Sequence, residues 1–184
     1  ILVVPQHFAQ GRLSHQSDLD PKFDITTCNL RERIRAFWNC SLPVDSNADA
    51  HSQGDTFITK WLGRQEELLQ TVRAISDLAN VDGCVVFRRD LEPVAFGAEI
   101  TVPCPRGNEE QMEVECTRLG TENVQVRTTN LSEFGTRHRS ALRFCMKHPN
   151  TLAFIVSQDG DLRVATSDDK GKTMLFEGVV ATYW

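Results

Sequence analysis

The sequence feature that most constrains the fold is an amphipathic helix followed directly by two strand patterns. In residues 65–79, apolar side chains recur along one helical face, and glutamate and arginine occupy the other faces. Residues 80–83 break this pattern, and residues 84–87 and 94–100 then have the composition of two paired strands. Because a helix with an apolar face must bury it, we expect this helix to pack on a sheet that the strands build.

Further strand patterns follow along the chain. Alternation of apolar and polar residues predicts a hairpin inside an excursion that covers about residues 104–128. A buried strand at residues 152–156, an Asp-Gly turn and a returning strand at residues 162–165 predict a second hairpin. With short strands expected at residues 1–4 and 174–181, these patterns predict an α/β protein whose mixed central β-sheet is flanked by helices.

The first sixty residues are harder to interpret than the rest. A modest helical stripe is expected in residues 30–38, and residues 41–55 have the Pro, Ser, Asn, Asp and Gly content of a loop. This loop is the best internal boundary, and it fits a surface loop of a single domain equally well. We therefore expect an N-terminal extension of uncertain structure at residues 1–60. The main domain is then expected at residues 61–184, which is long enough for a sizeable core.

Charge and cysteine content argue against several classes of protein. The net charge of −5 argues against general nucleic-acid binding, which needs a broad basic surface. No apolar run is long enough to cross a bilayer, and the first residues lack the pattern of a signal peptide, so we expect no membrane partner. The six cysteines include no Cys-x-x-Cys pair, which favours reduced thiols and a cytoplasmic location.

Three short segments carry the residues that point to chemistry. They are residues 82–84 (Asp-Gly-Cys), residues 135–139 (Gly-Thr-Arg-His-Arg) and residues 156–160 (Val-Ser-Gln-Asp-Gly). Each is expected at the end of a strand or at the start of a helix. Ligand sites of α/β sheets gather at such ends, so the three segments are candidates for one shared site.

The basic triplet opens a predicted helix. Thr136 is the expected N-cap, and Arg137, His138 and Arg139 then lie on the first turn, beside unpaired N–H groups and the positive end of the helix dipole. A phosphate at this position would meet backbone donors, two guanidinium groups and an imidazole. Taken alone, such a triplet is more often a solvated basic turn, and an Asp-Gly pair is an ordinary turn into a strand.

Taken together and in this order, the three segments resemble the diadenylate cyclase domain family. Its members carry Asp-Gly-Ala before a strand, then a small hairpin, Gly-Thr-Arg-His-Arg at the start of a helix, and a strand that ends in Val-Ser-Glu-Glu-Thr-Gly. The match covers about residues 65–166 and is most specific at residues 135–141, which are followed at the right distance by residues 152–157. The resemblance implies a mixed sheet flanked by helices, with ATP as the ligand. In active members, two facing domains join two ATP molecules into cyclic di-AMP and release pyrophosphate.

The resemblance also assigns positions around the nucleotide. It implies contacts with the nucleotide from residues of the three segments and of the strand between them: Gly83, Gly97, Thr136, Arg137, His138, Arg139 and Ser157. In an active enzyme Asp82 would help to activate the ribose hydroxyl. A Mg²⁺ or Mn²⁺ ion bound with ATP would be held by Asp82 together with Gln158 or Asp159.

The chain departs from active members of this family at the implied metal site. Where they place His before the Asp, this chain has Val81, and where they place Glu after the Ser, it has Gln158. An apolar side chain and a neutral amide are poor ligands for a hard cation. The sequence thus retains the phosphate-binding segments and weakens the metal site.

The sequence therefore favours a nucleotide-binding sensor domain of diadenylate cyclase fold that recognises ATP or a related adenine or cyclic nucleotide, such as a cyclic dinucleotide. The alternative is an active diadenylate cyclase that uses Asp82 with Asp159 or Gln158 around the metal. A third hypothesis is a structural interaction module with a vestigial pocket. The oligomeric state stays open, because cyclisation needs a homo-oligomer with two facing sites, whereas a sensor works as a monomer.

Overall fold

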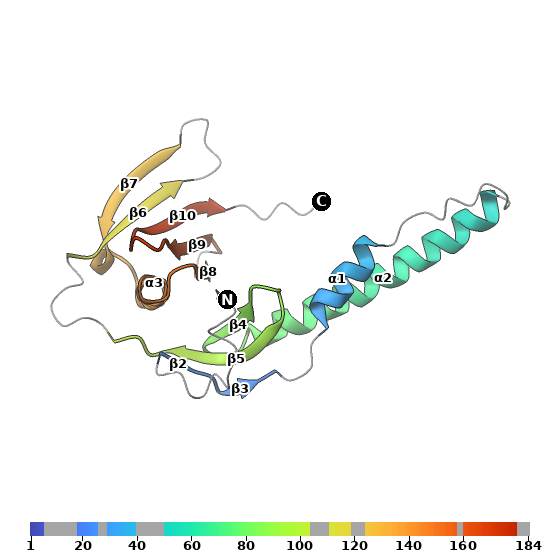
Figure 1. Ribbon diagram of the computed structural model, residues 1–184, viewed down its shortest axis with the longest axis horizontal. Helices are drawn as coiled ribbons and strands as arrows, with labels where there is room; N and C mark the ends of the chain where they lie inside the picture. Colours follow the sequence, from blue (N-terminus) through green and yellow to red (C-terminus); the bar gives the residue numbers. More distant parts are fainter. Residues whose placement is uncertain are drawn as a thin grey trace.

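The computed structural model describes residues 1–5, 18–25, 29–39, 50–103, 111–118, 124–157 and 160–179, with the backbone alone for residues 50–55. In this part of the chain, strands and three α-helices form a mixed α/β protein with one large sheet, as the sequence predicts (Figure 1).

The strands are β1 (Leu2–Val4), β2 (Leu19–Asp20), β3 (Phe23–Asp24), β4 (Cys84–Arg88), β5 (Pro93–Ile100), β6 (Glu113–Arg118), β7 (Gln125–Asn130), β8 (Leu152–Val156), β9 (Leu162–Ser167) and β10 (Thr173–Val179). The helices are α1 (Leu30–Trp38), α2 (Ala50–Leu78) and α3 (Thr136–Lys147), and a short 3₁₀ helix, Leu131–Glu133, precedes α3. Two predicted hairpins are confirmed: the alternating pattern forms β6–β7, and the buried strand with its returning strand forms β8–β9.

Strand β1 lies near the centre of the sheet. The strand order is β2-β5-β4-β1-β8-β9-β10-β6-β7, and β3 also pairs with β5. The pairs β1–β4 and β6–β10 are parallel, and the other neighbours are antiparallel. An apolar run such as Leu-Val-Val suits a strand covered on both faces. The described part of the first sixty residues thus contributes β1, β2 and β3 to the same sheet, and the boundary expected near residue 60 falls inside α2.

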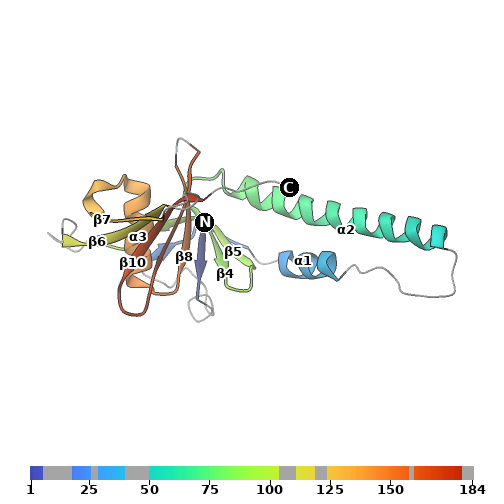
Figure 2. The same ribbon diagram turned by 90° about the horizontal axis from the view of Figure 1, so that it is seen from above.

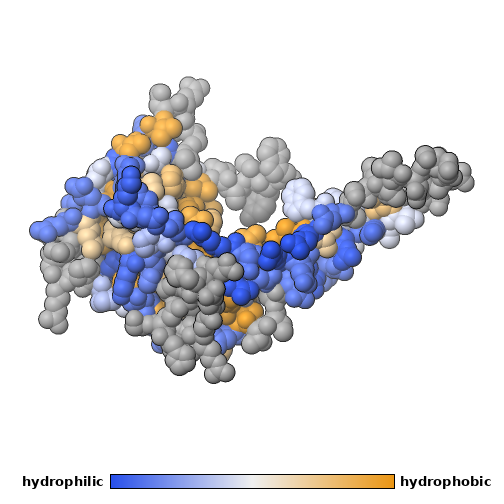
Figure 3. Space-filling model, viewed as in Figure 1, coloured by the Kyte–Doolittle hydropathy of each residue, from blue (hydrophilic) through white to orange (hydrophobic). Residues whose placement is uncertain are grey.

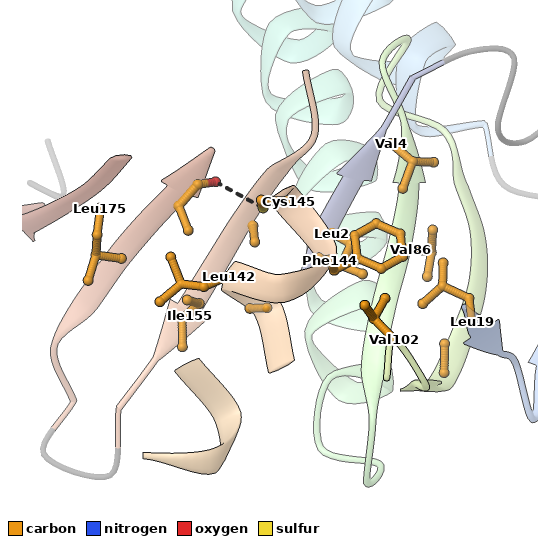
Figure 4. Close-up of a cluster of buried hydrophobic side chains, with 14 of the residues drawn as sticks. Leu2, Val4, Leu19, Val86, Val102, Leu142, Phe144, Cys145, Ile155 and Leu175 are labelled. Atoms are coloured by element: carbon orange, nitrogen blue, oxygen red, sulfur yellow. Dashed lines mark hydrogen bonds between the residues drawn. The ribbon is translucent and has the colours of Figure 1, made fainter. Parts of the chain in front are cut away.

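Helix α3 lies against the concave face of the sheet, which curves around it (Figure 1). Its apolar face buries Leu142, Phe144 and Cys145, because these residues recur at helical spacing. They pack against buried strand residues such as Val86 of β4 and Ile155 of β8 (Figure 4). This core holds α3 in a fixed position relative to the strand ends on both sides of β1.

On the opposite face of the sheet, α1 and the C-terminal part of α2 pack against β4 and its neighbours, and the rest of α2 extends past the sheet (Figure 2). Because side chains alternate along a strand, β4 directs Val85 and Phe87 to this face and Val86 to α3. Leu30 of α1 and Leu78 of α2 complete a second apolar cluster with them. The C-terminal end of α2 is therefore fixed on the strand that begins just after the Asp-Gly turn.

Helix α2 is longer than the sequence predicts. The expected helix covers residues 65–79, whereas the observed helix has 29 residues and begins at Ala50, inside the segment 41–55 that was expected to be a loop. Glycines at positions 54 and 63 hide this continuation, because glycine is a weak helix former. The N-terminal half projects past the sheet (Figures 1 and 2).

A row of apolar side chains on this helix is exposed: Ile58, Leu62, Leu69 and Val72. Figure 3 shows orange, hydrophobic residues along the helix, among blue, hydrophilic ones.

A buried carboxylate ties the segment before β2 to the end of α3. Asp18 is 6% exposed, and its oxygens lie 2.7 Å from Nζ of Lys147 and 2.9 Å from Nε2 of His148. Burial alone raises the pKa of Asp18, but the hydrogen bonds with Lys147 and His148 outweigh burial and lower the pKa below its ordinary value. We call these three residues the Asp18 clasp.

None of the described helices is long and apolar enough to span a bilayer. The described cysteines Cys84, Cys116 and Cys145 are free thiols. Burial raises the pKa of the Cys84 thiol to about 11 and that of the Cys145 thiol to about 12. Since the thiolate is the reactive form, these two cysteines are packing residues rather than nucleophiles.

Candidate functional site

The turn formed by Asp82 and Gly83 meets Gly97 at one edge of the sheet. Cys84, the first residue of β4, pairs with Ala98 of β5, and the two strands shift register just beyond this pair. Gly83 has a φ of +110°, and a Cβ on it would lie 2.5 Å from the carbonyl carbon of Gly97. This close backbone contact needs a residue without a side chain at position 83. It leaves Asp82 exposed at the start of β4.

The end of β8 and the start of α3 lie at the same edge. Strand β1 runs parallel to β4 and antiparallel to β8, so the start of β4 and the end of β8 share one edge. Arg137, in the first turn of α3, donates a hydrogen bond from Nη1 to the carbonyl oxygen of Val156, at 3.1 Å. Only β1 separates β4 from β8, so the two strand ends are about 10 Å apart. We call this region, from Asp82 and Gly97 to Val156 and α3, the site edge.

Helix α3 begins one residue earlier than predicted. The N-cap is Gly135, with φ −65° and ψ 161°, and Thr136 is the first helical residue. The prediction of Thr136 as the N-cap is therefore wrong. Gly135 takes the extended conformation of an N-cap but offers no side-chain oxygen, so no side chain caps the helix within the described residues. The early N–H groups of α3 consequently have no side-chain acceptor from their own cap. Arg137, His138 and Arg139 lie on the first turn, as predicted.

Ser157 follows β8 directly and organises the turn to β9. Its backbone N–H donates to the carbonyl of Asp161 at 2.9 Å, and its hydroxyl accepts from the backbone N–H of Asp161 at 3.1 Å. The N–H of Gly160, which has a φ of +84°, donates to the carbonyl of Ser157. The hydroxyl proton of Ser157 can still be donated to a ligand at the site edge.

His138 is a half-buried imidazole with an unsatisfied atom. Its Nε2 is buried and has no hydrogen-bond partner among the described residues. Its ring lies 6.3 Å from that of Phe134, centroid to centroid. Burial, and then the positive charges of Arg163 and Arg137, lower the pKa of His138 below its ordinary value. The imidazole is therefore neutral near pH 7, and its buried Nε2 has no hydrogen-bond partner among the described residues.

Two arginines that the sequence did not single out lie in the same region. Arg163 of β9 and Arg127 of β7 both pair with Glu177 of β10, with shortest N–O distances of 3.5 and 3.3 Å. The sequence contained a signal for Arg163, because it is two positions before Ala165, a core residue, and therefore lies on the same face of the strand. An arginine at a core-facing position of a strand indicates a charged group on the interior face of the sheet.

The described residues supply one of the three carboxylate or amide groups implied for a metal. Asp82 is at the site edge, and Gln158 and Asp159 lie outside the described residues. Within the described ranges no group of three or more His, Cys, Asp and Glu side chains is close enough to hold an ion. Among the described residues Asp82 thus offers a single carboxylate, whereas Mg²⁺ and Mn²⁺ need several oxygen ligands.

Two clefts lie away from the site edge, beside α1. They have volumes of about 510 and 430 Å³ and share Ile25, Asn29 and Pro93 in their walls. Charged residues that line the larger cleft pair with one another; Asp90, for example, lies 3.4 Å from Arg88 and 3.8 Å from Arg31. Neither cleft contains a residue of the three motif segments.

Comparison with protein-family models, with curated proteins and with solved structures gave no match. The class of protein is therefore inferred from the residues of the site edge and from their arrangement.

Proposed function

We propose that this protein is a nucleotide-binding sensor domain of diadenylate cyclase fold, which recognises ATP or a related adenine or cyclic nucleotide. One observation carries the proposal. The segments at residues 82–84, 135–139 and 156–157 are separated by up to 75 positions in the chain, yet they meet at one edge of the sheet. A family motif that occurred by chance would have no reason to converge in space.

The site edge offers complementary groups to a phosphate. The first turn of α3 presents backbone N–H groups that no cap side chain occupies, with the positive end of the helix dipole behind them. Arg137 uses one nitrogen to bind Val156, so its guanidinium is oriented while other N–H groups stay available. Asp82 lies across β1 at a distance that suits the opposite end of a nucleotide, where a carboxylate can accept a hydrogen bond from a ribose hydroxyl.

The alternative function, an active diadenylate cyclase, requires a divalent ion and two facing sites. Val81 and Gln158 replace the His and Glu that active members of the resembling family use, and neither is a good ligand for Mg²⁺ or Mn²⁺. The proposal therefore assigns nucleotide recognition, without efficient turnover, to this chain.

Calorimetric titration with AMP, ADP, ATP and cyclic di-AMP tests the proposal. We expect at least one of them to bind the wild type. Arg137→Ala should weaken that binding by about 1.5–3 kcal/mol, the scale of a hydrogen bond to a charged group. Arg73→Ala is the matched control, because Arg73 is an exposed residue of α2, away from the site edge, and should leave binding unchanged. Absence of binding by all four nucleotides, or equal behaviour of the two variants, contradicts the proposal.

A product assay separates the sensor from the cyclase. The protein is incubated at high concentration with ATP and either Mg²⁺ or Mn²⁺, and the mixture is analysed for cyclic di-AMP. The proposal expects binding without appreciable product. Robust product that is lost in Asp82→Asn would instead establish the cyclase.

A further inference from the structure

A cluster of charged residues extends the site edge along the concave face of the sheet. Glu177 of β10 has a side chain that is only 17% exposed and lies between Arg127 and Arg163. These three side chains come from three strands and from positions 14 to 50 residues apart. We call them the arginine cluster.

The strand register places Arg163 near the start of α3, with Glu177 one strand farther away and Arg127, on β7, two strands beyond Glu177. Arg163 pairs with Ile155, whose side chain is buried in the core under α3. Ile155 is next to Val156, the residue that holds Arg137. Arg163 and Glu177 are one and two strands away from β8, so they lie roughly 5 and 10 Å from it.

The charges of the cluster do not balance. Arg127 and Arg163 share the carboxylate of Glu177, and Glu133 adds a second negative charge near Arg127. Arg118, whose Cα is the strand partner of Glu177, adds a third positive charge, which leaves an excess of one positive charge. Arg163 also lies close enough to His138 to help lower its pKa. The side chain of Arg127 is 61% exposed, whereas that of Arg163 is 27% exposed. The charge of Arg163 is therefore screened less by solvent and gains more from a bound anion.

His138 connects the cluster with the first turn of α3. It lies near both Arg137 and Arg163, since both contribute to its electrostatic environment. Its Nε2 is buried and unpartnered in the described part of the chain. A buried nitrogen of this kind is costly unless a bound group supplies the missing hydrogen bond.

We propose that Arg127, Arg163 and His138 form a second phosphate subsite, which takes a further phosphoryl group of the nucleotide whose first phosphate lies at Arg137. The inference rests on the proposed function and specifies its ligand class: adenine nucleotides that carry more than one phosphoryl group. Glu177 keeps the two guanidinium groups oriented in the empty site. Arg127 comes from the β6–β7 hairpin, so the excursion at about residues 104–128 contributes to the selection of nucleotides with more than one phosphoryl group.

Titration of AMP and ATP into the wild type, Arg127→Gln and Arg163→Gln tests this subsite. We expect the wild type to bind ATP more tightly than AMP. Each variant should weaken ATP binding about tenfold, the effect of losing one charged hydrogen bond, and should change AMP binding less than threefold. Arg73→Gln is the control on α2 and should leave both affinities unchanged. Because Arg163→Gln leaves Glu177 short of a partner, the double variant Arg163→Gln/Glu177→Gln is measured too, and it should show the same selective loss.

The outcomes distinguish the subsite from the nucleotide site itself. If ATP binds and depends on Arg137, but Arg127→Gln and Arg163→Gln have no effect or weaken AMP and ATP equally, the second subsite is refuted and nucleotide binding stands. Equal affinity of the wild type for AMP and ATP also refutes it. If the wild type binds neither nucleotide, the second subsite falls together with adenine-nucleotide recognition.

Discussion

The contact between Gly83 and Gly97 makes a quantitative prediction about three alanine substitutions. In Gly83→Ala the new Cβ would lie 2.5 Å from the carbonyl carbon of Gly97 and 2.8 Å from two carbonyl oxygens, at a φ of +110°. In Gly97→Ala, at φ +64°, the nearest atom is 3.4 Å away, an ordinary contact. In Gly63→Ala, within α2, nothing lies within 4 Å. The same methyl group therefore meets three different environments.

The magnitudes follow from these distances. Left-handed backbone costs a non-glycine residue about 1–2 kcal/mol, so Gly97→Ala should lower the free energy of unfolding by about that amount. Gly83→Ala carries a comparable strain and must also displace the backbone of β5, which adds about 1–3 kcal/mol or more, so its total loss should be about 2–5 kcal/mol. Gly63→Ala should raise the free energy of unfolding by about 0.5–1 kcal/mol, because alanine favours the helix.

Guanidinium unfolding followed by circular dichroism measures all three variants on one scale. The expected order of stability is Gly63→Ala, wild type, Gly97→Ala and then Gly83→Ala. A Gly83→Ala variant as stable as Gly97→Ala would refute the close approach of the two backbones, and with it the geometry of the site edge.

Two further predictions concern the Asp18 clasp and His138. Asp18→Asn removes the charge from two hydrogen bonds and should lower the free energy of unfolding by about 1.5–3 kcal/mol at pH 7, measured by the same unfolding assay. Because folding lowers the pKa of Asp18, its contribution is present above the unfolded pKa and is lost as the pH falls through the folded pKa, so wild type and variant should converge in acid. Burial and the positive charges of Arg163 and Arg137 lower the pKa of His138, against the opposing effect of Glu177, and this pKa should rise when a phosphate binds beside the imidazole. Calorimetry at pH 6.5 in two buffers of different ionisation enthalpy should then show net proton uptake on ATP binding, reduced in His138→Gln; equal heats in both buffers would contradict this.

The sequence predicted the elements that have a regular pattern of their own. The helical face of residues 65–79 and the alternation in β6 and β7 are local signals, and both elements formed as expected. Strands β2 and β3 have two residues each and lie in a polar stretch, so no periodicity could indicate them. Their pairing with β5 depends on partners more than 70 positions away.

The candidate site was predictable in part for the same reason. Arg137, Asp82 and Gly83 were found through motifs with a fixed spacing, and the topology then placed them at one edge. The Thr136 cap was predicted from side-chain preference, but the extended backbone of Gly135 takes that position. Pairs such as Arg127 with Glu177, 50 residues apart, depend on how β10 and β7 flank β6, which no local pattern specifies.

The length of α2 has a mechanical consequence. Its last turn packs on β4, four residues before Asp82, while its other end is about 42 Å away. Because the helix is rigid and fixed at one end, a tilt of about 5° at Leu78 displaces its N-terminal end by about 4 Å over that length. A small change of tilt where α2 packs on β4 thus becomes a displacement of several ångströms along a helix that carries exposed leucine, isoleucine and valine side chains.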